Sequence, residues 1–178
     1  MPDKNTVLNI LSKVSSILEN ICEISGRMIS WLVIFMVLLV CYDVTMRYFF
    51  KGGSITLQEL EWHIFSLIFL LGTAYTFKHD DHVRLDLFYQ SRFMDDIKRA
   101  WVNIIGGTLF LIPFCLLIII CSWPFVYQSF IHAEGSPDPG GLPYRWLLKS
   151  AIPLGFLLLL LQGIADIFKN LVKVIGKS

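Results

Sequence analysis

Four long apolar runs decide what this chain can fold into. They lie at residues 28–50, 57–77, 101–123 and 147–168. Because a helix rises about 1.5 Å per residue, about 20 apolar residues cross the roughly 30 Å hydrocarbon core of a bilayer. Each run is therefore long enough to span a membrane, the second only just. We predict an all-α membrane protein with four transmembrane helices.

The composition supports a membrane location and excludes other classes. Of the 178 residues, 55% are hydrophobic and 16% are charged, whereas soluble domains have about 45–50% apolar and about 25% charged residues. A net charge of +1 without a soluble basic domain argues against nucleic-acid binding. No A-x-A-like cleavage site follows the first run, so we expect a retained helix rather than a signal peptide.

The distribution of lysine and arginine predicts the orientation. With four spans, both termini and the loop between the second and third spans share one side of the membrane. That side carries eleven Lys and Arg residues and the opposite side carries four. Since short cytoplasmic loops accumulate these residues, we expect both termini in the cytoplasm. The Gly/Pro-rich stretch 136–143 then lies outside.

Residues 1–27 differ from the transmembrane domain of residues 28–178. Their apolar residues recur at three- and four-residue spacing, with polar residues on the other side. We predict an amphipathic helix that lies flat in the cytoplasmic interface. Packing on a partner protein is the alternative, because the polar face is not notably basic. The loop 78–99 mixes five acids and five bases, and we expect another interfacial element, too short to bury a core.

The sequence contains no recognisable catalytic motif. The P-loop, G-x-G-x-x-G, G-x-S-x-G and H-E-x-x-H are all absent, and the four cysteines show no C-x-x-C spacing. We predict no enzymatic activity, no metal site and no cofactor. A bis-histidine haem needs two histidines at one depth, yet only His63 lies within a span. A haem- or quinone-binding anchor of a respiratory enzyme, or a small self-sufficient channel or exporter, are the alternative functions.

Charged residues stand near the outer ends of the first two spans. Charges at such depths are costly and usually pair or face protein. Asp43 and Arg47 are four residues apart on one helix face and can pair with each other. The short connection to the second span also allows Arg47 to pair with Glu59, which we prefer, or with Glu61. We predict an inter-helix brace rather than a proton or ion relay, because no chain of acids continues through the membrane.

Other features predict contact with a partner subunit. Small residues at 72–74 and 106–108 allow close helix approach. Trp62 is a candidate for the partner interface, although a simple interfacial aromatic belt also accounts for it. Pro113 should bend the third span. The chain has neither an internal repeat nor a second broken helix, features expected of a self-sufficient secondary transporter.

Several motifs resemble the small (DctQ-like) permease subunit of TRAP (tripartite ATP-independent periplasmic) transporters. The resemblance covers all four spans and rests on Tyr42-Asp43-Val44-Thr45-Met46-Arg47-Tyr48, Leu60-Glu61-Trp62, Leu70-Leu71-Gly72-Thr73-Ala74-Tyr75 and His82-Val83-Arg84-Leu85-Asp86. The stretches 140–146 and 152–156 are similar to the version found in sialic-acid systems. Either Glu59 or Glu61 matches the family's acidic position, since one residue separates them here.

The resemblance implies a non-catalytic scaffold subunit of a sodium-driven secondary transporter that imports an organic acid, with sialic acid the nearest type. The implied partners are a large multi-span membrane subunit, which binds substrate and sodium, and a periplasmic substrate-binding protein. The implied location is the bacterial inner membrane.

Overall fold

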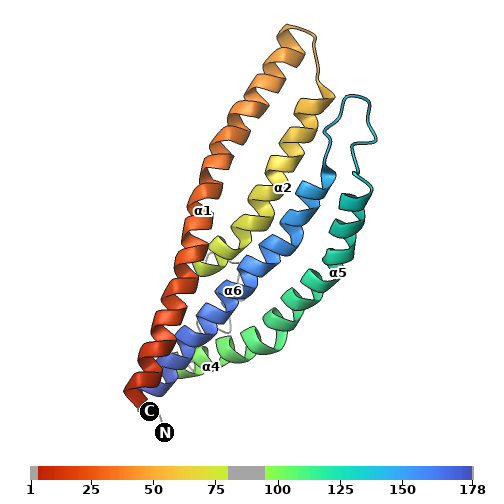
Figure 1. Cartoon of the computed structure of the whole chain (residues 1–178). Helices are drawn as coiled ribbons and strands as arrows, with labels where there is room; N and C mark the ends of the chain where they lie inside the picture. Colours follow the sequence, from red (N-terminus) through yellow and green to blue (C-terminus); the bar gives the residue numbers. More distant parts are fainter. Residues whose placement is uncertain (1–3, 80–94, 178) are drawn as a thin grey trace.

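The structure, a computed structural model, describes residues 4–79 and 95–177, and it contains no β-strand in that part of the chain (Figure 1). Its helices are α1 (Lys4–Phe49), α2 (Ile55–Lys78), α4 (Asp96–Gly106), the π-helical turn η1 (Gly107–Leu111), α5 (Ile112–Ile131) and α6 (Arg145–Lys177). Four helical segments are long and apolar enough to cross a membrane, and they contain the four predicted spans apart from the last residue of the first. The all-α prediction is confirmed, while the cytoplasmic position of the termini stays a prediction. The interfacial element expected within 78–99 lies mostly outside the described residues.

The amphipathic segment and the first span form one continuous helix of 46 residues. The amphipathic helix predicted for residues 1–27 is helical from Lys4, and it continues into the first span because both patterns have the period of one helix and no proline interrupts them. The amphipathic part lies along α6, where the Ser15 hydroxyl donates to the Ala165 carbonyl at 3.0 Å. Ile17 and Ile24 remain 60% and 62% exposed, so part of the apolar face is open to lipid or a partner. Its place in the membrane interface stays a prediction.

The third span is an arc composed of α4, η1 and α5 (Figure 1). The π-helical turn ends two residues before Pro113. Proline has no backbone N–H to donate to the preceding turn, and a π-helical turn inside an α-helix accompanies local bending. The expected bend is therefore present, and the π-helical turn that accompanies it begins at Gly107.

Helix α6 occupies the centre of the bundle. It contacts α1, α2, α4 and α5, whereas α4 and α5 pack mainly against α6. Small residues permit this, because a Cβ at Gly155 would lie 2.6 Å from the Leu70 carbonyl oxygen. Ala151 and Ala165 are 1% and 0% exposed. Lipid-embedded helices approach closely where side chains are small.

The predicted small-residue patches are only partly the points of closest approach. Gly107 lies close to the Ile167 side chain, as expected. A Cβ at Gly106 would meet no other atom within 4 Å, and one at Gly72 would only touch Ile29. α1 and α2 approach more closely at Gly26, where a Cβ would lie 2.0 Å from the Tyr75 ring.

Candidate functional site: charged anchors at the two ends of the bundle

Asp43 and Arg47 pair with each other near the end of α1. The Arg47 guanidinium donates to the Asp43 carboxylate one helical turn away. Asp43 is 1% exposed, while the Arg47 side chain is 46% exposed. The second carboxylate oxygen of Asp43, Oδ1, has no hydrogen-bond partner among the described residues. The arginine thus compensates a buried charge from the surface, as long basic side chains do near a membrane boundary.

Glu59 anchors the loop between α5 and α6. It is 5% exposed and accepts hydrogen bonds from the Ser136 hydroxyl and from the Leu142 backbone N–H, the latter at 2.6 Å. One turn earlier, the Thr56 hydroxyl donates to the Gly140 carbonyl. The first turn of α2 therefore holds a loop that lies about 80 residues further along the chain. We call Glu59, Ser136 and Leu142 the loop clamp.

The structure does not form the ion pair expected between Arg47 and Glu59. Arg47 reaches Asp43 on its own helix, and Glu59 is occupied by the two donors of the loop. Arg47 pairs with Asp43 because an acid four residues away on a helix is already within reach of an arginine. The brace between spans is thus a carboxylate–loop contact rather than an ion pair.

Glu61 and Trp62 follow the clamp on α2. Glu61 is half-buried, and its Oε1 has no hydrogen-bond partner among the residues that the structure describes. Trp62 is 68% exposed, and Phe65 and Phe69 continue its helix face at 59% and 67%. Residues three and four positions apart share one face. This aromatic face is open to lipid or to another protein.

A second anchor at the same end was not predicted. Lys149, in the first turns of α6, pairs with Glu134 of the loop, and its ammonium nitrogen also lies 3.9 Å from the centre of the Phe125 ring. The hydrogen bond from Lys149 lowers the pKa of Glu134 below its usual value. In the sequence, the only indication of this pair is that an acid, Glu134, precedes the loop and a base, Lys149, follows it.

The opposite end of the bundle holds a network centred on Glu23, also not predicted. The Glu23 carboxylate pairs with Lys78 at 2.7 Å and with Arg27 at 3.0 Å, and it lies within hydrogen-bond distance of the His79 ring at 3.2 Å. It joins the amphipathic part of α1 to the last turn of α2. The sequence signal was weak, since acids within an amphipathic helix usually face water.

Nothing in the described part of the chain indicates a metal or haem site. Among these residues no group of three or more His, Cys, Asp or Glu side chains could hold a metal ion. His63 and His132 each lie within hydrogen-bond distance of the carbonyl four residues earlier, at 2.6 and 2.8 Å. His79 lies beside Glu23, at the end of the bundle opposite to His63 and His132, and His82 falls outside the described residues. The arrangement can hold helices and loops together.

Comparison with known proteins gives one clear match. The family model described as "Tripartite ATP-independent periplasmic transporters, DctQ component" matches residues 36–173. The matched region starts within α1 and includes α2, α4, η1, α5 and most of α6. A comparison with curated proteins finds no match.

Proposed function

This chain belongs to the DctQ component family of tripartite ATP-independent periplasmic transporters, and from that premise we propose that it is the fixed scaffold of a sodium-driven importer of an organic acid. In this proposal a large membrane subunit binds substrate and sodium, and a periplasmic protein delivers the substrate. Of the organic acids, sialic acid is the one whose transporters the stretches 140–146 and 152–156 resemble.

The family match over 138 residues, which includes the second and third spanning helices, most of the fourth and the last part of the first, is the observation that carries the proposal. A family of transporter components accounts for a chain that has four spanning helices and no catalytic motif.

The scaffold role is supported by anchors at both ends of the bundle. The loop clamp joins α2 to the α5–α6 loop, the Lys149–Glu134 pair joins α6 to the same loop, and Glu23 joins α1 to α2. Helices tied at both ends resist sliding past one another, which suits a part that stays still while a neighbouring domain moves.

Reconstituted transport tests the subunit assignment. Proteoliposomes holding this chain with the large subunit and the binding protein should take up labelled sialic acid when a sodium gradient is imposed, but not when potassium replaces sodium. Vesicles with this chain alone should show no uptake. Uptake by this chain alone would reject the proposal, and uptake of another organic acid but not sialic acid would reject the substrate.

A cross-link tests the fixed role directly. Gly72 of α2 faces Ile29 of α1, with 4.0 Å between a Cβ built at Gly72 and the Ile29 side chain. In a background without native cysteines, Ile29→Cys with Gly72→Cys should cross-link on oxidation. Uptake should be the same before and after oxidation. Loss of uptake on oxidation that returns on reduction would mean that α1 and α2 must move.

The alternative functions are not favoured. The family that matches is one of transporter components, and His63 and His132 each lie within hydrogen-bond distance of a carbonyl of their own helix. An absorption spectrum of the purified protein without a haem band is the result expected.

A further inference from the structure

We propose that the groove beside α6, at the end of the molecule where both termini lie, binds one phospholipid molecule. Its phosphate headgroup would occupy a polar cavity and one acyl chain would occupy the apolar trough that adjoins the cavity. The proposal depends on the membrane location of the chain and not on the transport function.

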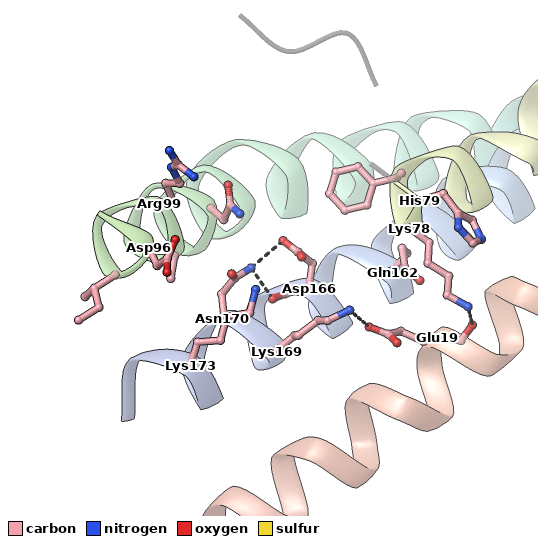
Figure 2. A pocket seen from close by; sticks show the side chains of 14 residues that line it. Glu19, Lys78, His79, Asp96, Arg99, Gln162, Asp166, Lys169, Asn170 and Lys173 are labelled. Carbon is pink, nitrogen blue, oxygen red and sulfur yellow. Dashed lines mark hydrogen bonds and ion pairs between the residues drawn. The ribbon is translucent and has the colours of Figure 1, made fainter. Parts of the chain in front are cut away.

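The polar cavity lies between α6, α4 and the end of α2 (Figure 2). Its volume is about 780 Å³. Four basic and three acidic side chains line it, so it carries a small positive excess: Lys78, Arg99, Lys169 and Lys173 against Glu19, Asp96 and Asp166. A cavity of this charge at a membrane surface suits the phosphate of a lipid headgroup.

Two of these lysines already have acidic partners, and one does not. Lys78 pairs with Glu23, and Lys169 pairs with Glu19 at 3.1 Å. Lys173, one turn beyond Lys169 on α6, is exposed and has no ion pair within the described part of the chain. Its ammonium group is therefore free to bind a phosphate.

Gln162 supplies a second, independent indication of a ligand. It lines the cavity, is 3% exposed, and its Oε1 has no hydrogen-bond donor among the described residues. A buried acceptor without a donor is costly. The hydroxyl or ammonium group of a glycerol or ethanolamine headgroup would provide that donor, which a bare phosphate ion does less well.

The apolar trough continues from the cavity along the third span. The two share Phe77, Asn103 and Asp166 in their walls. Beyond these, the trough is lined mainly by apolar side chains of η1, α5 and α6, among them Phe110, Phe114 and Leu159, and its volume is about 700 Å³.

The trough exists because glycines line it where α4 turns into η1. A Cβ at Gly106 would meet no atom within 4 Å, so this wall has open space in front of it. From Asn103 to Phe114 the helix rises about 16 Å at 1.5 Å per residue. This length suits an extended acyl chain.

The shape and the chemistry favour a lipid over a helix of another protein. The volumes of cavity and trough each fall within the roughly 300–1,000 Å³ of small-molecule sites, whereas a helix with its side chains is about 10–12 Å across. A lipid is polar at one end and apolar along the rest, in the same order as the groove. The trough also lies within a spanning segment, next to the hydrocarbon from which a chain would enter.

Native mass spectrometry of the full chain in mild detergent tests the proposal. The purified protein should retain one phospholipid, and the delipidated protein should bind one added phosphatidylglycerol. Lys173→Ala should weaken this binding about fivefold, because a lysine near an anionic lipid contributes about 1 kcal/mol and 1.4 kcal/mol is a factor of ten. Gly106→Leu, which fills the trough, should abolish it.

Two matched variants control for general effects. Lys13→Ala removes an exposed lysine of α1 that does not line the cavity. Gly176→Leu adds the same side chain at another glycine with open space. Both should bind lipid like the wild type, and all four variants should keep the helical circular dichroism of the wild type.

Three results would overturn the proposal. The first is that the delipidated protein binds no phospholipid. The second is that inorganic phosphate, titrated in parallel, displaces the lipid while Gly106→Leu has no effect on lipid binding. That result would assign the cavity to free anions. The third is that the purified protein retains no lipid and Gly106→Leu prevents co-purification of the large subunit. That result would assign the trough to a protein helix.

Discussion

Replacing Glu59 by alanine should release the α5–α6 loop from the start of α2. The carboxylate is almost fully buried and accepts two hydrogen bonds from the loop. Hydrogen bonds to a charged group contribute about 1.5–3 kcal/mol each, and a buried donor left without an acceptor costs about 1–3 kcal/mol. Because water can reach an opened loop, we expect a net loss of about 2–4 kcal/mol for the closed loop.

Hydrogen exchange of the Leu142 amide measures this loss directly, because that N–H donates to Glu59. When opening precedes exchange, the exchange rate follows the population of the open loop. A loss of about 2–4 kcal/mol raises that population roughly 30- to 700-fold. The Ser136 amide, which donates to the Leu142 carbonyl at 3.1 Å, should exchange faster as well.

A pair of glycines provides a second route to the same result. A Cβ at Gly141 would lie 2.4 Å from the Ser136 side chain and 2.8 Å from the Glu59 carboxylate, so Gly141→Ala should also open the clamp. Gly135→Ala, in the same loop, meets no atom within 4 Å and should leave exchange unchanged. Unaltered exchange at Leu142 in both Glu59→Ala and Gly141→Ala would refute the clamp.

Three further outcomes can be measured. A single cysteine at Ser136 should react with an impermeant reagent outside intact cells and one at Ser91 should not; the reverse pattern would invert the predicted orientation. Trp62→Ala should weaken the complex with the large subunit in detergent more than Trp101→Ala does, and equal behaviour would leave only an aromatic belt around the bilayer. The Lys149 partner lowers the pKa of Glu134, so the pair stabilises the loop fully above the unfolded pKa near 4.5 and loses that effect as the pH falls through the lower folded value. Hydrogen exchange of the loop amides should therefore depend little on this pair between pH 6 and 8, and the contribution of the pair should be lost only in acid.

The four spans could be predicted because length and apolar character alone decide whether a helix can cross a bilayer. No comparable property of the sequence identifies the loop clamp. Glu59 and Leu142 are 83 residues apart, and the donor is a backbone N–H, which every non-proline residue carries. The Asp43–Arg47 pair was among the alternatives because a spacing of four is a property of one helix. The preference for Glu59 as the partner of Arg47 was wrong, since it depended on how two helix ends and a distant loop meet.

The boundary predicted at residue 27 shows a second limit of prediction from the sequence. An amphipathic pattern and a uniformly apolar run have the same helical period, so the change in composition did not require a change in direction. Only the structure, in which α1 runs unbroken from Lys4 to Phe49, reveals that the helix continues. The arc of the third span was foreseeable from Pro113, while the π-helical turn beside Gly107 was not.

The central place of α6 has a consequence for how the protein is made. The α1–α2 hairpin can close as soon as its two helices are in the bilayer, because α1 and α2 contact each other extensively. The arc of α4 and α5 packs mainly on α6 and therefore has no complete surface to pack on until α6, which follows it in the chain, has been inserted. Membrane insertion and helix association are separable stages. A translation product that stops before Arg145 should thus hold a paired hairpin and an unassembled third span, which is the species that membrane quality control would encounter.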